Sequence, residues 1–191
     1  MTARTHDLFA LTAGALAIAY IQIPGLSLGT VVAAGGALFL GGMAPDLDEP
    51  GAQFWQRIPA GAGTILGKVV APVFGSHRFV THSAAGLAIL GWLVFKILEA
   101  SEGFLVVDGV VVWWAFIFGA ASHLAADMLT REGVPLLWPL PVKFGFPPIK
   151  ALRVTTGSWA EKVVFVALAA ADLWLIKSKY EVFAGFFGNL G

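Results

Sequence analysis

The residues of this chain that could do chemistry are four histidines and a few aspartates beside apolar segments. The histidines are His6, His77, His82 and His123. Asp127 follows His123 by four residues, in "HLAAD", a spacing that places both side chains on one face of a helix. An imidazole and a carboxylate so placed can bind a metal ion, or they can satisfy each other by a hydrogen bond inside a helix bundle.

Two further carboxylates, Asp46 and Asp48, occur in "PDLD", directly after an apolar segment that Pro45 helps to end. Alternate residues point the same way only in an extended segment. In that conformation the two carboxylates could share one metal ion or bridge two. An isolated pair of this kind is also typical of a polar turn in water.

The stretch "SHRFVTHS" brings two histidines to the start of another apolar segment. Thr81 or Ser83 can cap the helix that follows, which places His82 at its start and His77 in its approach. Neutral imidazole is the commonest metal ligand among titratable side chains. Arg78 could grip a phosphate or carboxylate with two parallel hydrogen bonds, or it could be a cation that snorkels to the membrane interface.

The chain contains no cysteine, so any metal ion must be held by nitrogen and oxygen ligands, which suits Zn or Mn. Only 13% of the residues are charged, against about 25% in a typical soluble domain. The net charge is zero, which provides no overall attraction for nucleic acid. Few charges are available, and the histidines and aspartates above gather where apolar segments begin or end.

Long apolar segments must position these side chains. Hydrophobic residues make up 58% of the chain, against about 45–50% in soluble domains, and they occur in runs that could cross or deeply enter a bilayer. These segments are residues 8–23, 28–43, 83–98, 109–129 and 160–176. The sequence therefore predicts an all-α, polytopic integral membrane helical bundle, a single domain over 1–191 with about five membrane helices.

Small residues within these segments predict a compact bundle, because glycine lets helix backbones approach closely. They are Gly14, Gly35, Gly36, Gly86, Gly91 and Gly119. We interpret the Gly35–Gly36 pair as a helix-packing contact. The linker 44–82 contains "GAGTILGKVVAPVFG", which predicts a short interfacial helix.

The distribution of Lys and Arg predicts the orientation. With five crossings, nine of these residues fall on the side of the N-terminus and three on the other side. The positive-inside rule then places the N-terminus, both large loops and all four histidines at the cytoplasmic face. Ionisable groups at membrane depth are costly and indicate a functional site.

Several motifs resemble the YdjM-like family, whose members are small membrane-bound proteins described as metal-dependent hydrolases. They are "TH" at 5–6, "PDLD" at 45–48, "HRxxTHS" at 77–83 and "HxxxDxxTxxG" at 123–133, of which "HRxxTHS" is the most specific. "TGSWAE" at 156–161 is also similar to a family segment. The resemblance implies a hydrolase of the inner membrane and names no substrate.

The leading hypothesis is a metal-dependent hydrolase with more candidate ligands than one tetrahedral zinc needs, which favours two ions. The ligand candidates are His6, Asp46, Asp48, His77, His82, His123 and Asp127. Arg78 could stabilise a phosphoryl oxygen, and Asp48 or Glu161 could act as general base. The substrate would be a lipid or lipid-linked phosphoester that arrives laterally in the bilayer. A metal transporter or sensor, or a structural membrane protein with a polar network, are the alternatives.

Overall fold

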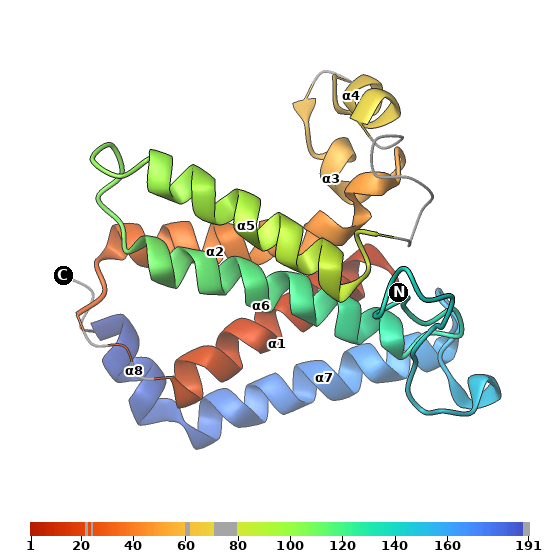
Figure 1. Cartoon of the computed structure of the whole chain (residues 1–191). Helices are drawn as coiled ribbons and strands as arrows, with labels where there is room; N and C mark the ends of the chain where they lie inside the picture. Colours follow the sequence, from red (N-terminus) through yellow and green to blue (C-terminus); the bar gives the residue numbers. More distant parts are fainter. Residues whose placement is uncertain (22, 24, 60–61, 71–79, 189–191) are drawn as a thin grey trace.

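The computed structural model describes residues 1–21, 23, 25–59, 62–70 and 80–188, and over this part of the chain it is helical, with only isolated β-bridges. The long helices are α1 (Ala3–Tyr20), α2 (Leu28–Met43), α5 (Ala84–Ala100), α6 (Gly109–Met128) and α7 (Trp159–Ser178). They lie alongside one another (Figure 1). Shorter elements are the 3₁₀ helices η1 (Ala44–Asp48) and η4 (Lys150–Leu152), and the helices α3 (Gln53–Gln56), α4 (Ala62–Val70) and α8 (Tyr180–Gly188). The predicted all-α class is confirmed.

Side-chain caps start four of the long helices. Ser27, Ser83 and Ser158 accept the backbone N–H three residues ahead, at the starts of α2, α5 and α7. Asp108 accepts two backbone N–H groups at the start of α6. Of the two predicted caps for α5, Ser83 is the one observed.

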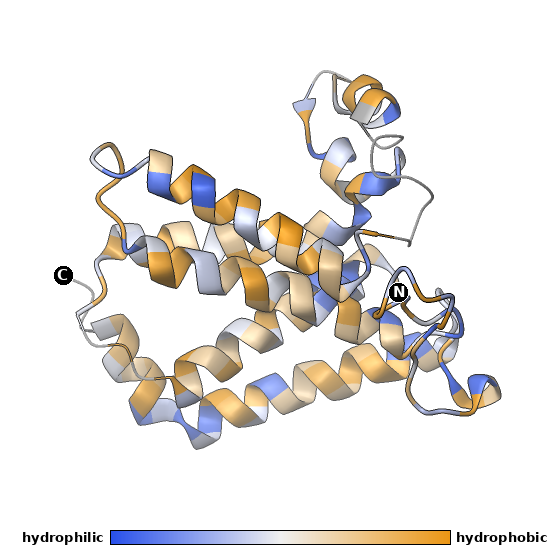
Figure 2. Cartoon of the chain, viewed as in Figure 1, coloured by the Kyte–Doolittle hydropathy of each residue, from blue (hydrophilic) through white to orange (hydrophobic). Residues whose placement is uncertain are grey.

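The segments Leu28–Asp48 and Gly109–Met128 are long and apolar enough to cross a membrane. Figure 2 shows apolar residues along the long helices, and large apolar side chains such as Trp92, Val166 and Leu173 are exposed on their outer faces. A lipid-facing surface accounts for that exposure. A membrane helical protein is thus supported, and the remaining crossings of the five-helix topology stay a prediction.

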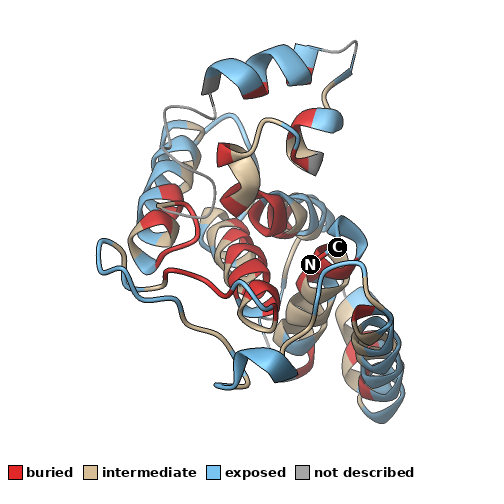
Figure 3. Cartoon of the chain, turned by 90° about the vertical axis from the view of Figure 1, so that its right-hand side faces the viewer, coloured by how far each residue is buried: buried red, intermediate tan, exposed pale blue. Residues whose placement is uncertain are grey.

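The centre of the bundle is the contact between α2 and α6, where the helix backbones approach closely. A Cβ at Gly41 would collide with the Phe116 carbonyl, and one at Gly119 with the Leu38 carbonyl. The packing interpretation of Gly35 and Gly36 is wrong, because a Cβ at either position would meet nothing within 4 Å. Figure 3 looks at the bundle from the end that carries the N-terminus and shows the buried residues gathered in its interior.

The predicted interfacial helix corresponds to α4, which projects from one end of the bundle with α3 (Figure 1). Gly63 and Gly67 lie against Trp55, whereas Ile65 and Val69 are exposed. Consecutive long helices run in opposite directions along the bundle. The ends of α2 and α6 therefore lie beside the starts of α1, α5 and α7, and this end carries the predicted site.

Candidate metal centre

Five of the predicted ligands converge at one end of the bundle from four separate elements. His6 comes from α1, Asp46 from η1, His82 from the residues before α5, and His123 and Asp127 from the last two turns of α6. All are buried except Asp46, whose side chain is 31% exposed. Their ligand atoms form two groups, His6–His123–Asp127 and Asp46–His82–His123, each with all atoms within 4.8 Å of one another. The two groups share His123.

The spacing of the ligand atoms is suited to cations between them. His6 Nε2 lies 3.4 Å from Asp127 Oδ1, and His82 Nε2 lies 3.4 Å from Asp46 Oδ1. His123 Nε2 lies 3.6 Å from Asp46 Oδ1 and 3.9 Å from Asp127 Oδ2. Hydrogen bonds of this type are about 2.7–3.2 Å long. Two ligands of one tetrahedral zinc, each about 2.1 Å from the ion, lie about 3.4 Å apart.

Backbone and side-chain partners fix the tautomers of two imidazoles. The Gly42 carbonyl lies 2.7 Å from His123 Nδ1 and can only accept, so Nδ1 carries the proton. The Thr81 hydroxyl donates to Asp48 Oδ2 at 2.7 Å and therefore accepts from His82 Nδ1 at 3.2 Å. In both rings the lone pair of Nε2 then faces the cluster, which is the arrangement that second-shell partners give to metal-binding histidines.

The electrostatics of the cluster also suit a cation. The Met1 ammonium lies 2.8 Å from Asp127 Oδ1. The ring of His6 stacks on that of His123, with centroids 3.9 Å apart. Among the residues that the structure describes, His6 Nδ1 and His123 Nε2 are buried with no hydrogen-bond partner. Burial lowers the pKa of His82 below its ordinary value of 6.5, so this imidazole is neutral and able to bind a metal at neutral pH.

Glu161, a predicted general base, is instead a buried anchor between α1 and α7. Its Oε1 accepts hydrogen bonds from Thr2 N at 2.6 Å, Thr2 Oγ1 at 2.7 Å and Thr5 Oγ1 at 2.6 Å. Its Oε2 accepts from Gly157 N at 2.6 Å. A carboxylate held by four donors has little basicity left, and its contacts fix the first turn of α1, which carries His6.

The structure thus divides the predicted site residues into three sets. Together in the cluster are His6, Asp46, His82, His123 and Asp127. Asp48 and Glu161 are also buried, but among the described residues neither contributes an atom to the two groups of ligands. Two predicted residues, His77 and Arg78, lie outside the described residues.

Sequence reasoning did not predict how the ligands are positioned. Thr5 and Thr81 are each 2% exposed and each precede a histidine of the cluster, so the repeated "TH" dipeptide was the available signal. Arg57 was also missed. Its guanidinium lies 3.1 Å from Asp7 Oδ2 and 3.1 Å from Met43 Sδ, so it joins the α3 segment to α1 and α2. No sequence signal marked it.

Comparisons with known proteins identify relatives over nearly the whole chain. The family model "YdjM inner membrane protein" matches residues 1–185. The Inner membrane protein YdjM of Escherichia coli K12 is 31% identical over 181 residues, which is 95% of this chain and 86% of that protein. The Uncharacterized protein YvsG of Bacillus subtilis 168 is 28% identical over 185 residues, 97% of this chain and 98% of that protein. No solved structure is significantly similar to the chain.

Proposed function

The chain belongs to the YdjM inner membrane protein family, and from the site in its fold we propose that it is a membrane-bound, metal-dependent hydrolase. It acts at the cytoplasmic face on a phosphoester or lipid-linked substrate. The observation that carries the proposal is the convergence of three imidazoles and two carboxylates on one buried point. Buried ionisable groups in a membrane protein are costly and mark function by default.

The ligand atoms would hold a divalent metal, with Zn or Mn as the best fit to nitrogen and oxygen donors. His123 belongs to both groups, but its single lone pair, on Nε2, would bind one ion only. Such ions supply an activated water and a Lewis acid for phosphoester hydrolysis. Asp46 is the one ligand with substantial exposure, so the substrate reaches the site from the η1 side.

The carboxylates outside the cluster have positioning roles in this proposal. Asp48 holds Thr81, which orients His82, and Glu161 holds the first turn of α1, which carries His6. Arg78 remains the proposed partner of a substrate phosphoryl group, because it follows His77 in the segment that leads to His82.

The proposed topology has five crossings, with α1, α5 and α7 added to the two helices that pass the length and apolarity criteria. The alternating directions of the helices and the excess of Lys and Arg in the loops at the site end support it. By the positive-inside rule, the excess of Lys and Arg supports a cytoplasmic N-terminus and metal centre.

Metal content tests the proposal first. We expect the full chain, purified in mild detergent without chelators, to contain at least one metal ion per chain by plasma mass spectrometry. We expect His82→Ala and Asp127→Asn to lose metal. Asp172→Asn is the control, because Asp172 is a half-buried carboxylate between α1 and α7 that accepts a hydrogen bond from Thr12 Oγ1 at 2.8 Å but lies outside both groups.

Hydrolysis of phospholipids by the metal-loaded protein tests the proposed enzymatic activity. The metal-loaded protein should release phosphate or a headgroup from membrane phospholipids, and His82→Ala should abolish this release. Metal retained in both ligand variants would remove these residues from a metal centre. Metal uptake into vesicles that depends on Asp172, without hydrolysis, would instead identify a transporter.

A further inference from the structure

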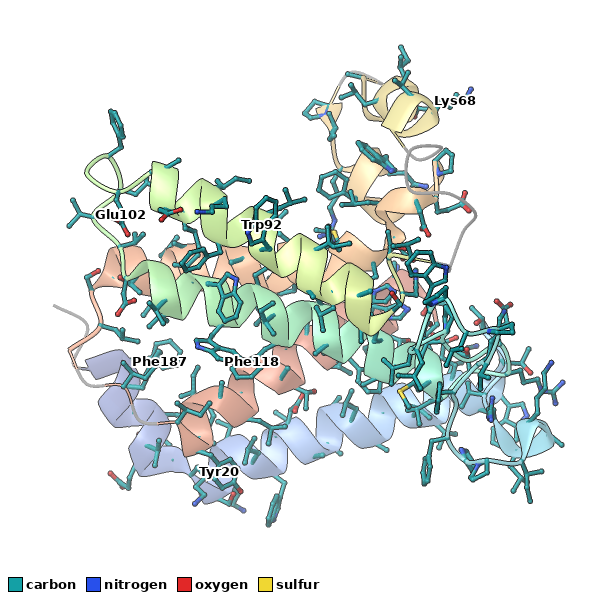
Figure 4. The ribbon with its side chains drawn as sticks, viewed as in Figure 1. Tyr20, Lys68, Trp92, Glu102, Phe118 and Phe187 are labelled. Atoms are coloured by element: carbon teal, nitrogen blue, oxygen red, sulfur yellow. The ribbon has the colours of Figure 1, made fainter. Side chains whose placement is uncertain are left out.

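An apolar groove lies between α1, α2, α6 and α8, at the end of the bundle away from the metal centre. It has a volume of about 640 Å³, and every residue that lines it is glycine or carries an apolar or aromatic side chain. A neighbouring hollow of about 500 Å³ shares Gly14, Ile18, Leu38 and Phe187 with it. Figure 4 shows Phe118 of α6 and Phe187 of α8 on its two sides.

Glycine keeps this groove open. Gly35 lines it, and a Cβ added there would meet nothing within 4 Å. On the opposite wall, a Cβ at Gly14 would meet only the Leu38 side chain. Gly35 therefore leaves space that a larger residue would fill, whereas Gly14 lets the Leu38 side chain of α2 approach α1 closely, because a Cβ there would lie 2.7 Å from Leu38 Cδ2.

We propose that this groove binds an acyl chain of a membrane phospholipid and that this lipid is the hydrolase substrate; the second part rests on the proposed function. Two of the walls, α2 and α6, are the helices that are long and apolar enough to cross a membrane. The groove therefore lies at the depth of the hydrocarbon core. An apolar cavity of this kind excludes water, and the surrounding lipid chains are its natural occupant.

The groove and the metal centre share their helices, so one lipid can reach both. On α6, Phe118 lines the groove five residues before His123. On α1, Leu11 lines the neighbouring hollow five residues after His6. At 1.5 Å per residue these offsets are about 7–8 Å. A chain in the groove thus points its ester end toward the cluster, and the glycerol and phosphate follow in that direction.

The test compares a substitution that fills the groove with the same substitution at the neighbouring position. Gly35→Leu adds a side chain to the lining of the groove. Gly36→Leu is the matched control, since Gly36 is exposed like Gly35 and has the same free space around its Cβ, but lies outside the lining. Val111→Phe fills the groove from α6 and covers the case in which Gly35→Leu does not fold. Each full-length variant is placed in nanodiscs that contain phosphatidylethanolamine with a photoreactive group in one acyl chain.

After irradiation, labelled peptides are mapped by mass spectrometry. We expect wild-type labelling at groove residues such as Ile18, a roughly tenfold loss in Gly35→Leu and Val111→Phe, and no change in Gly36→Leu; tenfold is the loss expected when about two chain methylenes are no longer buried. Equal labelling in all variants, or labelling confined to outward residues such as Trp92, overturns the proposal. So does a stable dimer in which a second copy fills the groove.

Metal content and phospholipid hydrolysis, measured on the same samples, separate this proposal from the hydrolase proposal. If hydrolysis occurs but Gly35→Leu behaves as Gly36→Leu, the groove proposal fails and the hydrolase stands. If labelling follows the prediction without hydrolysis in any variant, the groove stands and the hydrolase fails. If both hold, Gly35→Leu should raise KM roughly tenfold with little change in kcat, because the lost contact binds substrate and transition state alike.

Discussion

Replacing Thr81 by valine should weaken metal binding while the ligands themselves remain in place. The substitution keeps the shape of the side chain and removes the hydroxyl that joins His82 Nδ1, at 3.2 Å, to Asp48 Oδ2, at 2.7 Å. The ring of His82 then loses the partner that fixes its tautomer. Both Thr81 and His82 are almost completely buried, so water does not replace the hydroxyl.

The magnitude follows from these contacts. Loss of a second-shell partner of a metal-binding histidine typically costs about 10–100-fold in metal affinity. That range corresponds to about 1.4–2.7 kcal/mol in binding free energy. The metal-free protein should also become less stable by about 1–3 kcal/mol, because a buried donor or acceptor is left unsatisfied. Thr81→Ser keeps the hydroxyl and should restore most of the metal affinity.

The assay is competition with a chromogenic chelator, with zinc and then manganese, on the full chain in detergent. The thermal unfolding temperature of the metal-free variants is measured in parallel. Equal metal affinity in Thr81→Val and wild type would refute the second-shell role. Equal loss in Thr81→Val and Thr81→Ser would refute the hydroxyl as its cause, because the serine variant retains that group.

Three further predictions follow from single contacts. Glu161→Gln replaces one carboxylate oxygen by an amide NH₂, which cannot accept from Gly157 N or, in the other orientation, from the donors of Thr2 and Thr5. This change should lower stability by about 1–3 kcal/mol, read as a lower unfolding temperature with bound metal retained. Gly119→Leu drives a side chain into the Leu38 carbonyl, so the variant should fail to accumulate as monodisperse protein in size-exclusion chromatography. Because burial lowers the pKa of His82, the unfolded chain takes up this proton first below about pH 6.5, and the unfolding temperature of the metal-free protein should fall from pH 7 to pH 5.

The helices were predictable because each corresponds to a continuous apolar segment of the sequence. The predicted segments 28–43 and 109–129 match α2 and α6 to within one residue at each end. The first helix was placed too late, at residue 8, although it begins at Ala3. Its early start is held by Glu161, which lies about 160 residues along the chain and could not be linked to Thr2 or Thr5 from spacing alone.

The different roles of the two aspartates of "PDLD" could not be predicted from the local sequence. An extended segment would point Asp46 and Asp48 the same way, but the segment forms the 3₁₀ helix η1. With three residues per turn, side chains two apart point in different directions. Asp46 therefore faces the imidazoles, and Asp48 faces Thr81. The residue types indicated a metal centre, but only the tertiary structure separates ligand from positioning residue.

The position of the cluster near the ends of the helices explains how a membrane protein can bury ionisable side chains. Its ligands come from the first turn of α1, from η1, from the residues just before α5 and from the last two turns of α6, and none comes from the middle of a long helix. A charged side chain costs most at the bilayer centre and much less near the interface. The helices thus bring imidazoles and carboxylates together at one end of the bundle, where Asp46 is partly exposed, while the groove lies toward the other end. This division requires the ligands and the groove to share α1, α2 and α6, so a substitution that separates α2 from α6 should impair metal binding and lipid binding together.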